Sequence, residues 1–243
     1  MSAGSIRLVL LLFFSIASQG ALLSPVLGQS SAQSSSVSTN SASKSSSATP
    51  KKTSSATDTA IDAGAVVNGV YRNKTFGLTS TIPAGWVLRT EEMNARDDAS
   101  QPDSDPVAKD ATRVGQPGVG RVLLAAFSRP PEAKGEDVNA SILIAAESAA
   151  TYPGLKEAAQ YFGPLLEVTK AQGLTMDEDP YDVAVGTTTL VRGDFHKDVG
   201  SRVMRQSTLV MLSHGYALSI TLIGGTDDEV EDLVDGLSFV GRK

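Results

Sequence analysis

A β-hairpin between Arg202 and Gly225 organises the chain. Two β-rich runs flank the pair His214-Gly215, and glycine supplies the positive φ that a two-residue hairpin turn requires. Such a turn fixes the register, so we expect three facing pairs on one apolar face. The pairs are Met211 with Leu218, Leu209 with Ile220, and Ser207 with Leu222. The opposite face is small and only half polar, so a second layer can cover it.

Further strands and helices are expected on both sides of this hairpin. Alternating or continuous apolar runs predict strands over 70–75, 77–82, 121–127, 140–147, 174–176, 181–185 and 187–195. Apolar spacing and end signals predict helices over 91–98, from Pro153 to Gly173 with a kink or a division into two short helices at Gly163-Pro164, and after the capping pair Thr226 and Glu229. Tight hairpins in place of βαβ crossovers predict an α+β fold, with an antiparallel β-sheet and helices packed on it.

The N-terminal segment is typical of export. Arg7 precedes an apolar run that ends near Val26-Leu27-Gly28, which is the pattern of a signal peptide over 1–28. Cleavage after Gly28 fits best, and Gly20 is a second candidate. The alternative is an uncleaved anchor over 8–27, which approaches the roughly 20 residues that span a bilayer. We therefore expect a periplasmic or extracellular protein, or one tethered to the membrane by that anchor.

Composition divides the rest of the chain. Residues 29–64 are mostly Ser, Thr and Ala, which cannot bury enough apolar surface to fold, so we expect a disordered linker followed by one domain over 65–243. The chain has no cysteine, which excludes thiol catalysis and Cys-ligated zinc. Its formal net charge of −6 argues against nucleic acid as a partner.

The opening of the domain resembles a known family. The segment Tyr71-Arg-Asn-Lys-Thr-Phe76-Gly77, followed by Ile82-Pro83-Ala84-Gly85-Trp86, is similar to the start of PsbP-like and DcrB-like domains. The resemblance covers roughly residues 68–241 and implies a helix–sheet–helix sandwich. It also implies a non-enzymatic accessory protein, and it assigns no functional residue. The acidic insertion after Trp86 and the missing lipoprotein cysteine depart from that family.

Two features remain as candidate interaction sites. Trp86 is the only tryptophan, and we interpret it as a core anchor, with a place on a ligand platform as the alternative. Residues 97–120 are acidic, contain three prolines and lack a periodic apolar face, which predicts a long loop. A loop of this kind on a rigid sheet is suited to a basic partner surface, so the expected partner is another envelope protein.

Catalytic signatures are weak. Asp194 and His196 are two residues apart on an expected strand, which places them on one face and allows a hydrolase as a third hypothesis. We expect them to be solvated residues at a strand end. Ser213 and His214 are neighbours, but we expect their side chains to point apart and therefore not to form a nucleophile and base. We predict no catalytic, cofactor-binding or metal site. The leading hypothesis is an exported accessory or protein-binding module, and the alternative is a small-molecule binder that uses a cleft between sheet and helices.

Overall fold

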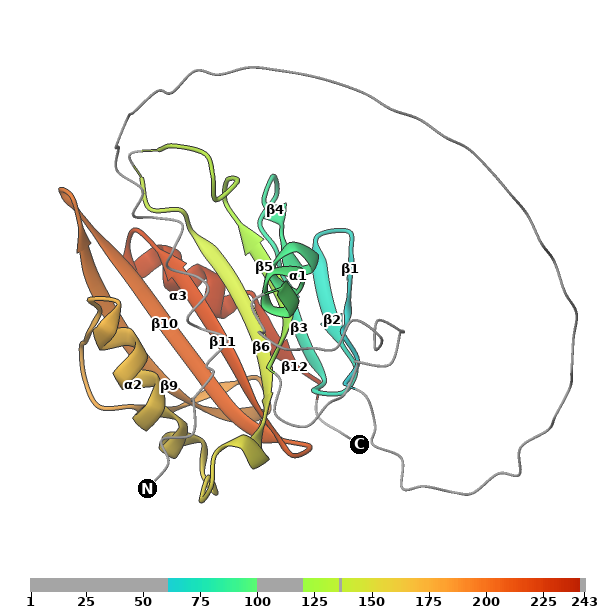
Figure 1. The fold of residues 1–243 in the computed structure, drawn as a ribbon. Coiled ribbons are helices and arrows are strands. Elements are labelled where there is room, and N and C mark those ends of the chain that lie inside the picture. The colour runs from blue at the N-terminus through green and yellow to red at the C-terminus, as the bar shows by residue number, and fades with distance from the viewer. Residues whose placement is uncertain (1–60, 100–119, 136, 241–243) are drawn as a thin grey trace, which may run out of the picture.

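The computed structural model describes residues 61–99, 120–135 and 137–240. Its large antiparallel sheet has eight strands, in the order β4-β5-β6-β11-β10-β9-β7, with β8 also paired to β9. The strands are β4 (Val87–Leu88), β5 (Arg121–Phe127), β6 (Ser141–Ser148), β7 (Thr175–Met176), β8 (Tyr181–Val185), β9 (Thr188–Val199), β10 (Arg202–Ser213) and β11 (Tyr216–Gly224). The α+β fold class expected from the sequence is confirmed (Figure 1).

The predicted hairpin lies at the centre of this sheet. Strands β10 and β11 pair with the expected register, including Met211 opposite Leu218 and Leu209 opposite Ile220. The turn residues His214 and Gly215 have φ values of 54° and 79°, as a two-residue turn that follows the strand twist requires. The register and the apolar face predicted from the two-residue turn are therefore confirmed.

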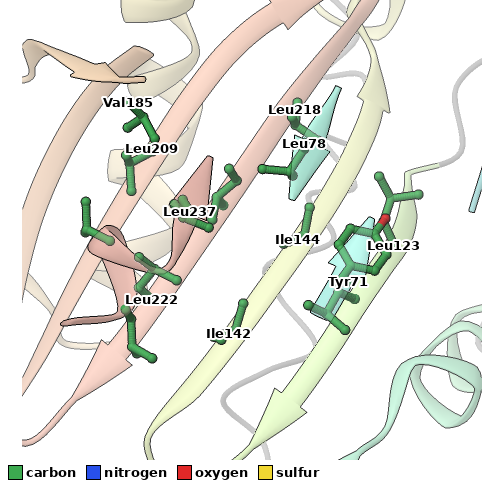
Figure 2. Close-up of a cluster of buried hydrophobic side chains, with 14 of the residues drawn as sticks. Tyr71, Leu78, Leu123, Ile142, Ile144, Val185, Leu209, Leu218, Leu222 and Leu237 are labelled. Carbon is green, nitrogen blue, oxygen red and sulfur yellow. The ribbon is translucent and has the colours of Figure 1, made fainter. Parts of the chain in front are cut away.

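A second, smaller sheet covers the apolar face of the hairpin, and the sequence did not predict it. It has four strands in the order β1-β2-β3-β12. They are β1 (Ala65–Val67), β2 (Val70–Asn73), β3 (Leu78–Thr81) and β12 (Leu237–Phe239). Figure 2 shows Leu78 and Tyr71 from the small sheet together with Leu218 and Ile144 from the large one. Helix α3 (Asp227–Asp235) buries Val230, Leu233 and Val234 in the same core.

Helices cover the other face of the large sheet, so the domain has three layers. Helix α1 (Thr90–Ala99) packs on β5, and the segment formed by the 3-10 helix η3 (Ala158–Tyr161) and α2 (Phe162–Ala171) packs on β10, β9 and β7. A further 3-10 helix, η2 (Ala149–Thr151), follows β6 directly. The second core, on this face, contains Phe162, Leu165 and Phe195 together with Val210 of the central hairpin.

Some element boundaries differ from those expected. No helix begins at Pro153: residues 152–157 are irregular, and helical structure starts at Ala158. Gly163 and Pro164 do not break a helix but lie in the first turn of α2, where a missing N–H costs nothing because first-turn donors have no intrahelical partner. Two short helices are present, but η3 and α2 meet between Tyr161 and Phe162 and not at Gly163-Pro164. At the start of α3, the Glu229 carboxylate accepts a hydrogen bond from the N–H of Gly225 (2.6 Å). The Thr226 hydroxyl accepts one from the N–H of Glu229.

The described part of the chain begins at Ile61, whose side chain packs on the first core. Asp62 and Ala63 accept hydrogen bonds from the side chains of Asn73 and Tyr71, so the packed structure reaches a few residues before Ala65. The expected signal peptide, most of the linker and most of the acidic loop lie outside the described residues. Within the described ranges, no helix is long and apolar enough to cross a bilayer.

Candidate functional site

A pocket of about 450 Å³ lies at the end of the large sheet where β6 passes into η2. We call it the Tyr152 pocket. Its lining residues are Thr151, Tyr152, Pro153, Gly154, Leu155, Gln160, Tyr161, Pro164 and Glu167. The volume lies within the range of roughly 300–1,000 Å³ that is usual for small-molecule sites. The lining residues all come from one stretch of chain, Thr151 to Glu167, which runs from η2 into α2 (Phe162–Ala171).

A buried carboxylate stands behind this pocket. Glu147, the second-last residue of β6, is 3% exposed. Its carboxylate accepts a hydrogen bond from the Tyr161 hydroxyl at 3.1 Å and another from the Tyr152 hydroxyl. The two tyrosine rings pack edge to face, with centroids 5.4 Å apart and an interplanar angle of 74°. The three side chains form one polar cluster, which a buried carboxylate requires because burial without hydrogen bonds is costly.

The electrostatics of the cluster keep both hydroxyls protonated. Burial, and after it the nearby charge of Glu147, raises the pKa of Tyr152 above its ordinary value. The same causes, in the same order, raise the pKa of Tyr161. Both phenols therefore act as donors to Glu147 at any pH near neutrality. Because Tyr161 is completely buried and Tyr152 only half-buried, Tyr152 is the member of the pair that a molecule in the pocket can reach.

Local sequence explains why the chain leaves the sheet at this point. The N–H of Ala149 donates to the carbonyl of Gly215 (2.9 Å), which ties η2 to the turn of the central hairpin. Gly154 has a φ of 90°, a conformation that favours glycine. The side-chain oxygen of Gln160 then accepts from the N–H groups of Lys156 (2.7 Å) and Glu157 (3.2 Å). These bonds fix the irregular segment that forms the pocket wall.

The Asp194 and His196 pair is not arranged as the hydrolase hypothesis requires. The two residues lie inside β9, which continues to Val199, and not at a strand end. Asp194 accepts from Arg192 (2.9 Å) and from the Tyr181 hydroxyl (2.8 Å), while the imidazole of His196 contacts Asp177. The carboxylate that orients His196 is therefore Asp177. Asp194 belongs to a structural ion pair instead.

That ion pair is anchored in the core between the sheet and α3. Arg192 is 8% exposed, and its guanidinium also donates to Glu231 of α3 at 3.2 Å. Burial is the largest single influence on the pKa of Arg192 and lowers it. The carboxylates of Glu231 and Asp194 together outweigh burial, so the pKa is raised above its ordinary value. A buried guanidinium requires such partners, so this cluster serves the packing of α3 on β9.

The expectation that the side chains of Ser213 and His214 point apart is wrong. Ser213 Oγ lies 2.7 Å from His214 Nδ1. The left-handed backbone of His214, with φ 54°, is consistent with a side chain that folds back toward the preceding residue. The ring of Phe76 lies edge-on to the imidazole, with centroids 6.1 Å apart. The contact joins the half-buried last residue of β10 to an exposed turn residue.

The pocket differs in place from the cleft that the sequence suggested. Trp86 is partly buried and packs on the first core, between the two sheets, so its interpretation as a core anchor holds. It lines no part of the Tyr152 pocket. Among the described residues, no three acidic or histidine side chains converge into a metal site.

Sequence reasoning missed Glu147 and the two tyrosines. One signal was present, because Glu147 ends the otherwise apolar run ASILIAAE. A carboxylate at the end of a buried strand needs hydrogen-bond donors, and Tyr152 and Tyr161 follow within fourteen residues of it. The missing information was the irregular path of 152–157, which folds both tyrosines back onto the strand.

No protein-family model matches the chain, and no curated protein matches it. Among solved structures, the chain is similar to cyanobacterial PsbP from Synechocystis sp. PCC 6803 (19% identity, 70% of this chain and 91% of that chain, TM-score 0.39). It is also similar to LpqN, involved in cell envelope biogenesis of Mycobacterium tuberculosis (15%, 68% and 83%, 0.32). A third is a protein of unknown function from Pseudomonas aeruginosa (17%, 53% and 86%, 0.34).

These similarities concern the fold. One of these solved structures is a PsbP protein, and the resemblance noted in the sequence stays a prediction. At such identities and TM-scores, nothing about activity or partners follows from them.

Proposed function

We propose that this protein is an exported, non-enzymatic accessory module of the cell envelope that binds a small molecule in the Tyr152 pocket. The observation that carries the proposal is the pocket itself, backed by the Glu147 carboxylate and its two tyrosine donors. Concave sites with apolar walls and a few fixed polar groups are where proteins bind small molecules. Export is supported by the signal-peptide pattern over 1–28 and the Ser-rich segment that follows it.

A non-enzymatic role is supported by how the reactive groups are used. Asp194 is engaged by Arg192 and Tyr181, and the imidazole of His196 contacts Asp177. Groups held in structural ion pairs are poor candidates for acid–base catalysis, although perturbed ionisable groups occur at both kinds of site. The hydrolase hypothesis therefore loses the dyad on which it rested.

A protein partner is the second candidate function. The segment 97–120 carries five aspartates, and acidic segments of this kind suit basic partner surfaces. The segment falls largely outside the described residues, so the proposal rests on its charge. Replacing residues 100–119 with a short Gly-Ser linker is expected to remove a salt-sensitive partner from an affinity purification of envelope extract. If every partner survives the replacement, the segment is not the binding site.

The small-molecule proposal is tested by a fragment screen with NMR detection on the full chain. The screen uses soluble neutral, anionic and cationic fragments, and we expect binding to shift the amide signals of residues 147–167. Thr151→Trp places a large side chain in the pocket, because Thr151 is an exposed lining residue. It is expected to abolish these shifts.

The matched control is Ser201→Trp. Ser201 is exposed in the turn between β9 and β10, at the opposite end of these strands from the turn at Gly215 to which η2 is tied. This variant is expected to bind as the wild type does. The proposal fails if no fragment binds, or if the shifts persist in Thr151→Trp.

A further inference from the structure

The side chains of the Tyr152 pocket are negative or neutral. Glu167 is an exposed lining residue, and Glu147 lies behind the wall with 3% exposure. None of the nine lining residues is basic. Lys156, which falls between two stretches of the lining in sequence, is not one of them. An anionic ligand would therefore meet repulsion from two carboxylates here and no compensating cation in the lining.

The aromatic side chains add an attraction for positive charge. A cation placed over a tyrosine ring is attracted by the quadrupole of the ring. Tyr152 is half-buried at the pocket, and its hydroxyl donates to the Glu147 carboxylate, which increases the electron density of the ring. Tyr161 packs edge to face against it and holds it in place. Tyr152 is therefore a fixed aromatic side chain at the pocket, with the Glu147 carboxylate at its hydroxyl end.

The remaining lining is apolar. Pro153, Leu155 and Pro164 contribute hydrocarbon surface to the wall, which suits a ligand with an apolar body. Thr151 and Gln160 are neutral polar side chains in the lining, and the oxygen of Gln160 is already engaged by two backbone N–H groups. A bare inorganic cation would find few oxygen ligands on such a wall.

Building on the proposed function, we infer that the Tyr152 pocket selects small organic cations, in which an ammonium or quaternary ammonium group is carried on an apolar body. The aromatic pair and the two carboxylates recognise the charge, and the prolines and Leu155 contact the hydrocarbon part. A neutral ligand of the same shape keeps only the contacts with the prolines and Leu155.

The test compares choline with its neutral carbon isostere 3,3-dimethylbutan-1-ol, each titrated calorimetrically into the full chain. A cation–π contribution of the usual size makes choline bind roughly 3- to 30-fold tighter. The isostere is the more apolar of the two, so burial alone would favour it. Equal affinity, or tighter binding of the isostere, overturns the inference.

Two variants of Tyr152 make the test specific. Tyr152→Leu keeps an apolar side chain and removes the ring, so the preference for choline is expected to fall by roughly 3-fold or more, to the part that the two carboxylates supply. Tyr152→Phe keeps the ring and is expected to retain a preference for choline. An unchanged ratio in Tyr152→Leu contradicts the inference even when choline binds.

The outcomes separate the two proposals. If neutral or acidic fragments bind at residues 147–167 and choline does not, the pocket is a binding site for a different ligand class and only this inference fails. If choline shifts the amide signals of other residues and not those of 147–167, its site lies elsewhere and the inference also fails. If neither choline nor any fragment binds, the proposed function fails with it.

Discussion

The Tyr161 hydroxyl donates a 3.1 Å hydrogen bond to the Glu147 carboxylate, and neither side chain is more than 3% exposed. Water has little access to either group, so loss of this donor leaves part of a buried charge unsatisfied. We expect Tyr161→Phe to reduce the free energy of unfolding by about 1–3 kcal/mol. Urea denaturation at pH 7 measures the change.

The matched variant is Tyr152→Phe, which removes the other donor to the same carboxylate. Tyr152 is only half-buried, so a water molecule at the pocket can replace its hydroxyl. We expect this variant to lose less stability than Tyr161→Phe. A larger loss in Tyr152→Phe would mean that Glu147 depends on the pocket-side donor and that its buried donor is dispensable.

Alkaline pH tests the buried hydroxyl of Tyr71. Burial is the main cause that raises the pKa of Tyr71 to about 12 in the folded protein, against an ordinary value near 10 in the unfolded chain. Between these two values the unfolded state loses the proton first, so stability falls as pH rises. The full effect is about 2–3 kcal/mol, present below pH 10 and lost through pH 12.

Tyr71→Phe removes this titration, at the cost of the hydroxyl's bonds to Ala63 and Asn73. The variant is expected to be less stable at pH 8 and to show a shallower decline of stability between pH 9.5 and 11.5. Denaturation midpoints across this pH range measure the slope. Identical slopes in the two proteins would show that Tyr71 does not titrate differently on folding.

The central hairpin offers a second comparison of buried and exposed positions. Ile220 is completely buried opposite Leu209, so Ile220→Ala is expected to cost about 2–5 kcal/mol through lost burial and the cavity it leaves. His214→Asn is expected to change stability by less than about 1 kcal/mol, because asparagine tolerates the positive φ of 54° at this position. Equal losses would contradict the register.

These contrasts show what local sequence can and cannot predict. The pairing of Leu209 with Ile220 followed from a two-residue turn, whose geometry is set by adjacent residues. The four-stranded sheet was not predicted because β3 and β12 are short and far apart in the sequence. Their pairing joins Leu78 to Phe239, near the two ends of the domain sequence. Non-adjacent pairings of this kind are decided by packing and leave no local periodicity.

The candidate site was missed for a related reason. The position of Glu147 is readable as the polar end of an apolar strand, but its partners depend on the irregular path after Tyr152. The Asp194 and His196 pair shows the converse. The strand places both on one face, and Arg192 lies on the same strand, but Tyr181 and Asp177 come from β8 and from the residue after β7. Which residues share a face of a strand follows from their spacing in the sequence. Contacts with other segments of the chain do not.

Export is tested at the N-terminus. If 1–28 is a cleaved signal peptide, protein isolated from its native envelope is expected to begin near Gln29. Mild proteolysis is then expected to trim it toward Ile61, where the side chain first packs on the core, without loss of the folded domain. Intact-mass measurement of the isolated protein and of the proteolysed domain identifies both N-termini. A mature protein that retains Met1 would instead support the uncleaved anchor.

The most direct test of the account is the content of the pocket in the cell. Wild-type protein, Thr151→Trp and Ser201→Trp are expressed in the native host, purified from the envelope, and extracted for mass spectrometry of bound small molecules. We expect an organic compound to be recovered with the wild type and with Ser201→Trp, and to be depleted in Thr151→Trp. Equal recovery of every bound compound from all three proteins would contradict binding in the Tyr152 pocket.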